Sequence, residues 1–252
     1  MKKKLKSFYF IFSSLIICFL HIPFAFGNKT GYCHETFFYP PVKILKSTDP
    51  VAVISSFRSL YDSLNLEVSG LSRQAYELAQ SGFKKMKLEG RLTNDSVLSI
   101  VDFSQPSDKK RLYVLDLKNY KVLYNTLVAH GKKSGKLWAQ SFSNRPSSYK
   151  SSIGFYLTGQ PYEGSNGYSL KLNGLDKGFN NNAARRAIVL HGAGYVCDSY
   201  INEQGYIGRS EGCPAVPIQF ARDIINTIKD GSCLFIYHSN KIYRQRSALL
   251  KG

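Results

Sequence analysis

Residues 96–131 read SVLSIVDFSQPSDKKRLYVLDLKNYKVLYNTLVAHG, and this stretch decides the fold class. It holds short runs of valine, isoleucine, leucine, tyrosine and phenylalanine, separated by serine, proline, asparagine and charged residues. That alternation is typical of β-strands joined by turns. Similar runs follow at SSIGFYLTG (151–159), GYSLKLNGL (167–175), RRAIVLHGA (185–193) and SCLFIYH (232–238). We therefore expect a mainly β (α+β) domain whose sheet is mostly antiparallel.

Helical periodicity occurs before the first predicted strand and again before the last one. Two apolar runs with three- and four-residue steps precede the first strand: Val53, Phe57, Leu60, Tyr61 and Leu64, then Leu71, Ala75, Leu78, Ala79 and Phe83. One late helix is predicted in VPIQFARDIINTIKDG (216–231), with Gly231 as its stop. Its predicted buried side consists of Ile218, Ala221, Ile224, Ile225 and Ile228.

The first 27 residues have the features of a secretory signal peptide. Four lysines within residues 2–6 precede the apolar run FYFIFSSLIICFL (8–20), and AFG (25–27) supplies small residues for cleavage. An uncleaved anchor is the alternative; after cleavage we expect no stable membrane span, because no other segment approaches the required length. The chain then divides into a signal peptide (1–27), an N-terminal arm (28–49), a helical preface (50–92), a β domain (93–240) and a basic C-terminal tail (241–252).

Charge and cysteine content limit the classes of function. The chain has 34 Lys and Arg against 17 Asp and Glu, and loss of the four leader lysines leaves a net charge of +13. For an exported protein this favours an anionic envelope polymer over nucleic acid, although basic charge can also serve solubility alone. The mature chain keeps Cys33, Cys197, Cys213 and Cys233, too few for a disulfide scaffold and without a CxxC zinc motif. We expect no cofactor and no metal.

The stretch GRSEGCPAV (208–216) places Cys213 in a setting suited to chemistry. Gly212 permits a tight backbone, and Pro214 turns the chain away after the cysteine. Such a turn exposes the thiol and aims amide N–H groups at one point, as an oxyanion hole requires. A buried structural cysteine is the alternative, but such residues usually sit in apolar runs, as Cys233 does.

His191 is the candidate partner of this cysteine. It ends the apolar strand AIVL and is followed by Gly192, so its ring can face a cleft. A histidine and a Gly-Cys-Pro turn 22 residues apart fit a nucleophile pair in which the imidazole moves the proton of the thiol. Arg209 adds positive charge beside the turn. We predict oxyanion donors at the N–H groups of Gly212 and Cys213.

The segments RRAIVLHGAGYV, GYIGRSEGCPAV and IKDGSCLFIY resemble the catalytic domain of murein L,D-transpeptidases, in a divergent branch related to the YkuD-like fold. The resemblance extends over roughly residues 95–240. It implies an L,D-transpeptidase-like β-sandwich or barrel with one late helix, preceded by a short helical segment. It also implies a site in which His191, Ser210, Gly212 and Cys213 match the family motifs, with Cys213 as the acylated nucleophile.

The resemblance implies a periplasmic or wall-associated enzyme acting on peptidoglycan stem peptides. D-alanine would leave, a Cys213 thioester would form, and an amine of a neighbouring stem would resolve it. The alternatives are L,D-carboxypeptidase activity, if water resolves the thioester, and an inactive wall-binding protein with the same fold. Two departures motivate the last alternative: Glu211 stands where better-known members have His, and Ala215 stands where they have Arg or Asn. Arg209 is a candidate for the missing positive charge.

Three further residues are candidates for substrate binding. His130 precedes Gly131 in a second His-Gly pair, and we expect it to line the cleft, although a strand exit is an equal alternative. Gly192 and Glu211 neighbour the two catalytic candidates. The sequence leaves the oligomeric state and the disulfide pairing open.

Overall fold

The computed structural model describes residues 60–251. The predicted signal peptide, the N-terminal arm and the first ten residues of the helical preface lie outside the described residues, as does Cys33. Within the described range, no helix is both long enough and apolar enough to cross a membrane.

Eight strands form one sheet in the order β3-β2-β1-β8-β4-β5-β6-β7. Neighbouring strands are antiparallel except for the pairs β1–β8 and β6–β7, which are parallel. The predicted mainly β fold class is thereby confirmed. The strands are β1 (Val97–Asp102), β2 (Leu112–Asp116), β3 (Lys121–Thr126), β4 (Gly154–Gly164), β5 (Gly167–Gly174), β6 (Val189–Ala193), β7 (Ala215–Pro217) and β8 (Cys233–Tyr237).

The two outer strands of this sheet are joined through the segment that follows β3. Ala129 pairs with Ala215 of β7, and its N–H donates to the Ala215 carbonyl at 2.7 Å. Further along, the Ser210 N–H donates to His130 O at 3.0 Å, and the Lys132 N–H donates to Ser210 O at 2.7 Å. The sheet is therefore close to a barrel, and the closure lies next to Cys213.

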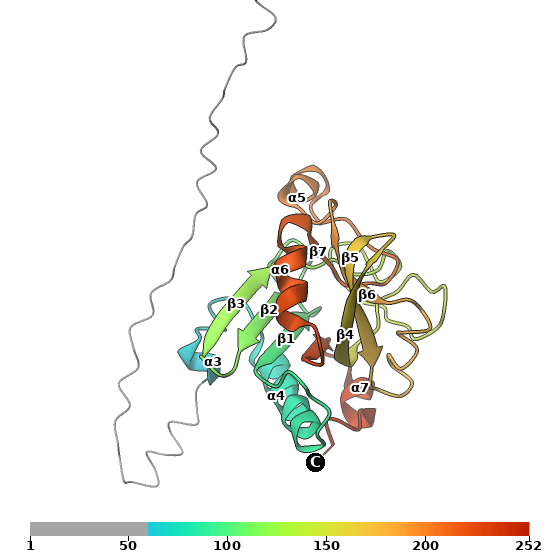
Figure 1. The fold of residues 1–252 in the computed structure, drawn as a ribbon. Helices are drawn as coiled ribbons and strands as arrows, with labels where there is room; N and C mark the ends of the chain where they lie inside the picture. The colour runs from blue at the N-terminus through green and yellow to red at the C-terminus, as the bar shows by residue number, and fades with distance from the viewer. Residues whose placement is uncertain (1–59, 252) are drawn as a thin grey trace, which may run out of the picture. The chain divides into compact units, whose positions relative to one another are not determined.

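Two helices pack on the strands (Figure 1). α4 (Arg73–Leu88) contacts β1 and β8, and its N-cap is Ser72, whose Oγ accepts from the Ala75 N–H at 3.1 Å. α6 (Ile218–Ile228) contacts β6 and β7 and buries the apolar side that its periodicity predicts: Ala221, Ile224, Ile225 and Ile228. A short helix, α3 (Leu60–Ser63), precedes α4.

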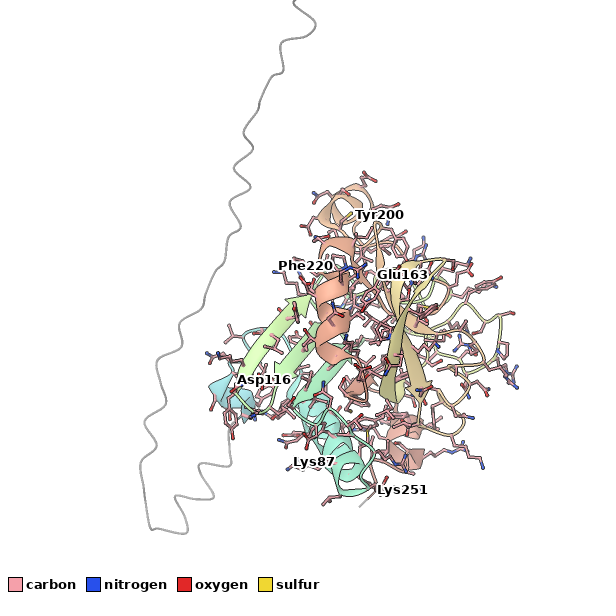
Figure 2. The ribbon with its side chains drawn as sticks, viewed as in Figure 1. Lys87, Asp116, Glu163, Tyr200, Phe220 and Lys251 are labelled. Carbon is pink, nitrogen blue, oxygen red and sulfur yellow. The ribbon has the colours of Figure 1, made fainter. Side chains whose placement is uncertain are left out.

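The predicted burial of Ile218 is wrong. Ile218 is 62% exposed, because it begins α6 above Gly192 and Gly194, which have no side chains to cover it. Phe220 is also on the exposed surface of α6 (Figure 2), at 43% exposure.

The structure has two helices that the sequence analysis did not predict. α5 (Asp198–Gln204) follows β6 and has no buried residue. α7 (Lys241–Arg246) lies in the segment expected to be a basic tail, and it buries Tyr243 completely. The chain end lies against α4, since Lys85 Nζ donates to the carbonyls of Ala248 (2.9 Å) and Lys251 (2.7 Å), and Figure 2 labels Lys251 near Lys87.

A glycine sets how closely α4 approaches the sheet. A Cβ at Gly82 would lie 2.1 Å from Phe155 Cζ. Phe155 is fully buried and stacks on Phe235 with ring centroids 4.2 Å apart, so it has no space to move. Only glycine fits at this contact.

Replacing Gly82 by alanine should therefore destabilise the fold despite the higher helix propensity of alanine. We expect the free energy of unfolding to fall by about 1–3 kcal/mol, the usual cost of overpacking a core. Chemical denaturation of Gly82→Ala measures this, with Ser81→Ala on the exposed side of α4 as the matched control. Equal stability of the two variants would contradict the close approach.

A buried polar pair lies beneath the closure of the sheet. Arg111, which immediately precedes β2, is fully buried. Its Nε and Nη2 donate to Val128 O at 3.1 and 2.9 Å, and Nη2 also donates to His130 Nδ1 at 2.7 Å. The His130 Nε2–H donates to Gly135 O at 3.2 Å. Burial and the Arg111 charge lower the pKa of His130 to about 3. His130 is therefore neutral in the folded protein.

This pair predicts a pH dependence of stability. Above pH 6.5 His130 is neutral in both states; as the pH falls from 6.5 towards about 3, only the unfolded chain binds the proton, and the free energy of unfolding decreases. His130→Gln preserves an acceptor and a donor but does not titrate. We expect wild type to lose about 2.5 kcal/mol more than this variant between pH 7 and pH 4.5. Urea titrations at the two pH values measure the difference, and equal losses would contradict it.

Candidate active site

The turn that carries Cys213 requires glycine at the preceding position. Gly212 has φ +130°, and a Cβ there would lie 2.8 Å from Lys150 O and 3.2 Å from Arg186 Nη2. Pro214 follows, and β7 begins at Ala215. The turn therefore fits between the 150 segment and Arg186 only because residue 212 has no side chain.

Ser210 holds this turn from within. Its Oγ donates to Cys213 O at 2.6 Å and accepts from the Gly212 N–H at 3.0 Å. A second serine holds the turn from outside, since Ser151 Oγ donates to Gly212 O at 3.2 Å and accepts from the Gly131 N–H at 3.0 Å. The Gly212 amide is thus engaged, which differs from its predicted oxyanion role. The Cys213 amide has no hydrogen-bond partner among residues 60–251.

The Cys213 thiol is partly exposed and lies against residues 186–189. Its Sγ donates to Ala187 O at 3.8 Å. Burial raises the pKa of the thiol, while a hydrogen bond from the Val189 backbone and the Arg186 charge lower it, and Glu211 raises it. The net direction is upward, so Cys213 rests as a neutral thiol at neutral pH.

His191 lies on β6, beside the turn. It pairs in register with Ala215, two residues after Cys213, and its own N–H approaches Pro214 O at 3.4 Å. The ring Nδ1 contacts Gly192 O at 3.0 Å, and because a carbonyl only accepts, Nδ1 carries the hydrogen. Burial lowers the pKa of His191, so the ring is neutral and its Nε2 holds a free electron pair.

The imidazole and the thiol are not hydrogen-bonded to each other in this state. The thiol hydrogen bond goes to Ala187 O instead. What the fold brings together is a neutral thiol and a neutral imidazole with a defined tautomer, on the two neighbouring segments β6 and the turn before β7. This arrangement is chemically suited to proton transfer from sulfur to nitrogen, followed by nucleophilic attack.

Arg186 is a site residue that the sequence analysis missed. Its guanidinium donates to Ser143 O (2.8 Å), Lys150 O (2.7 Å), Ser148 Oγ (3.2 Å) and the hydroxyl of Ser152. All four acceptors are uncharged, and among the described residues no carboxylate pairs with it. Arg186 therefore places an unneutralised positive charge beside the turn.

Arg209, predicted to supply that charge, has other partners. Its Nη1 donates to Lys132 O at 3.3 Å and to Gly135 O at 3.1 Å, and its guanidinium lies over the Tyr206 ring. The charge that acts on Cys213 comes from Arg186. Arg209 instead ties the Cys213 loop to the 132–135 segment.

The predicted substrate-binding residues have different environments. His130 is 0% exposed, so its ring does not line a cleft, because the Arg111 and Gly135 contacts hold it inside. Glu211 is exposed and pairs with Lys132 at 2.7 Å, a contact worth little by itself at a surface. Gly192 is in contact with α6, where a Cβ would lie 2.8 Å from Ala221 Cβ.

Tyr195 is a second residue that the motifs did not identify. Burial, with smaller contributions from Cys213 and Glu211, raises its pKa to about 12. A Cβ at Gly208 would lie 2.4 Å from Tyr195 Cβ and 2.7 Å from the ring atoms Cγ and Cδ2, so Gly208 is required for this packing. The spacing of His191 and Cys213 gives no signal for Tyr195; the only signal for Arg186 is its position just before the strand that carries His191.

Within residues 60–251, no group of three or more histidine, cysteine, aspartate or glutamate side chains is arranged to hold a metal ion. Cys197, Cys213 and Cys233 are all free thiols.

Comparison with solved structures finds L,D-transpeptidases. One from Mycobacterium smegmatis is 13% identical, with 57% of this chain and 59% of that chain covered and a TM-score of 0.35. One from Mycobacterium tuberculosis is 14% identical, with 57% and 58% covered and a TM-score of 0.35. The helical cell-shape-determining protein Pgp2 of Campylobacter jejuni is 14% identical, with 68% and 58% covered and a TM-score of 0.39. This chain thus spans less than two thirds of each.

Comparison with curated protein sequences gives no match. The sequence does match a family of protein domains described as the L,D-transpeptidase catalytic domain, over residues 67–237, which is more than half of the chain. The chain belongs to the family of L,D-transpeptidase catalytic domains.

Proposed function

We propose that this protein is an exported cysteine acyltransferase that acts on peptidoglycan stem peptides, with Cys213 as nucleophile and His191 as general base. The observation that carries the proposal is the pairing of a partly exposed thiol on a glycine-dependent turn with a buried neutral imidazole on the neighbouring strand. Family membership supports the reaction class.

The resting protonation states determine the first step. Both groups are neutral, so the thiol becomes nucleophilic only when its proton moves to His191 Nε2. Nδ1–H keeps its bond to Gly192 O during this transfer and stabilises the imidazolium. The proposed transfer requires the Cys213 side chain to leave Ala187 O, its acceptor at rest, and to turn towards His191 Nε2.

The thiolate then attacks the carbonyl carbon of the bond between the diamino acid and the terminal D-alanine. The carbonyl electrons move to oxygen, and the Cys213 N–H is the donor available to that oxyanion. When the C–N bond breaks, the imidazolium returns its proton to the departing amine, and D-alanine leaves. An amine of a second stem attacks the thioester, loses its proton to His191, and releases the Cys213 thiol with a new amide bond.

The net charge supports an anionic polymer as substrate. The sequence without its four leader lysines carries a net charge of +13, and stem peptides carry free carboxylates. The N-terminal lysine cluster and apolar run support export to the compartment that holds this polymer.

The first test is acylation of Cys213 by a carbapenem. We expect intact-mass spectrometry to show one adduct on wild type and on Cys197→Ala, and none on Cys213→Ala. Cys197 is the matched control, because it is a free thiol with partial exposure on the loop after β6. An adduct on the Cys213→Ala variant would show that another residue is acylated and would contradict the assignment of Cys213 as nucleophile.

Product analysis with purified muropeptides separates the outcomes that follow acylation. Crosslinked dimers support transpeptidation. Trimmed monomers alone would indicate that water resolves the thioester, and sacculus binding without adduct or product would contradict the enzymatic proposal.

The second test concerns the base. His191→Gln preserves much of the side-chain volume but cannot accept the proton, and we expect its acylation rate at pH 7 to fall by about 10²–10⁴-fold. In wild type, acylation should also slow as the pH drops below 6.5, through the lowered pKa of His191. Time-resolved mass spectrometry measures both effects. If the acylation rate of the variant stays within about threefold of the wild-type rate, His191 is not the general base.

A further inference from the structure

The guanidinium of Arg186 is a fixed positive charge beside the candidate nucleophile, and none of the sequence motifs identified it. Arg186 immediately precedes Ala187, whose carbonyl accepts the Cys213 hydrogen bond at 3.8 Å. Its Nη2 is 3.2 Å from the position that a Cβ of Gly212 would occupy. The guanidinium therefore lies beside the turn, close enough for its charge to act on Cys213.

The hydrogen bonds of Arg186 fix its position without neutralising it. Nη1 donates to Ser143 O and the Ser152 hydroxyl, and Nη2 donates to Lys150 O and Ser148 Oγ. These are carbonyl and hydroxyl oxygens on the segment 143–152. A guanidinium held by neutral acceptors and half-buried keeps its full charge close to the turn, where water screens it less than at an open surface.

Within residues 60–251, Arg186 is the only cation whose charge acts on the Cys213 thiol. Lys150, whose backbone packs against the turn, directs its Nζ to Ser141 Oγ at 2.6 Å. Glu211, on the same turn, is negative and paired with Lys132 at 2.7 Å. Tyr195 is neutral, with its pKa raised to about 12, and His191 on β6 is neutral because burial lowers its pKa. Arg209 is turned to the carbonyls of Lys132 and Gly135.

We propose that Arg186 is the residue whose charge stabilises the Cys213 thiolate. Arg186 acts as a positioning residue with a second, electrostatic effect: it holds the 143–152 segment against Gly212 and lowers the free energy of the thiolate. The inference rests on the proposed role of Cys213 as nucleophile.

The effect of the Arg186 charge on the pKa of the Cys213 thiol has a defined direction and can be measured. Burial raises the pKa of the Cys213 thiol, and Arg186 opposes that rise. Removing the charge should raise the pKa further and reduce the thiolate fraction at any pH below it. One pKa unit corresponds to about a tenfold change in that fraction.

The test is the rate of Cys213 alkylation by iodoacetamide between pH 6 and pH 10, followed by peptide mass spectrometry on the full chain. We expect Arg186→Gln to react about tenfold more slowly than wild type in the lower part of this range, well below the pKa of the thiol, and the two rates to converge as the pH approaches and passes that pKa. Arg185→Gln is the matched control. Arg185 directly precedes Arg186 and its side chain is exposed, so this variant removes the same charge from the neighbouring position. Its alkylation rate should stay at the wild-type level.

Arg186→Lys keeps the charge and loses the planar fork of donors. Its alkylation rate should stay within about threefold of wild type, and it carries the test alone if Arg186→Gln does not fold. A tenfold loss in the lysine variant, or an unchanged rate in a folded glutamine variant, would overturn the proposal. Because alkylation needs no stem peptide, a failed muropeptide assay with a shifted alkylation rate would count against the proposed function but not against the effect of the Arg186 charge on the thiol.

Discussion

The hydrogen bonds between residues 129–132 and 210–215 are the constraint on which the site depends. β7 has only three residues, and Ala129 joins it to the segment leaving β3, so the first and last strands of the sheet meet there. Ser210 is bonded on both sides, to His130 O and to the Lys132 N–H. This double attachment fixes the start of the Cys213 turn against a buried part of the sheet, which a three-residue edge strand could not do alone.

Hydrogen bonds of buried polar groups connect this part of the sheet to the turn that bears the thiol. Arg111 and His130 hold the 128–135 segment from below, and Ser151 connects Gly131 to Gly212. Burial raises the pKa of Cys213 and lowers that of His191, so neither group is charged at rest. In the proposed mechanism a charge forms only when a proton moves from Cys213 to His191, and Arg186 is the group proposed to favour the resulting thiolate.

Local patterns predicted much of this architecture, because they reflect local physical chemistry. Alternating apolar and turn residues identified every strand except the three-residue β7, and three- and four-residue periodicity identified α4 and α6. The same reasoning failed where tertiary contacts outweigh local pattern. Ile218 has helical periodicity but nothing to cover it, and the segment 241–251 looked like a basic tail yet buries Tyr243, whose hydroxyl donates to the buried Asp176 at 3.0 Å.

The sequence by itself determined the candidate nucleophile and base, since glycine at 212, proline at 214 and a strand-ending histidine are requirements of the backbone around a reactive thiol. Only the tertiary structure decided which other residues surround that thiol. Arg186 approaches it through carbonyl and hydroxyl acceptors on a segment about 40 residues earlier, within 143–152, and carbonyls are present at every position of a chain. His130 and Arg209 looked equally suited to the cleft. Folding instead directed their side chains to backbone carbonyls and to Arg111, because buried donors must find acceptors and local sequence does not specify which.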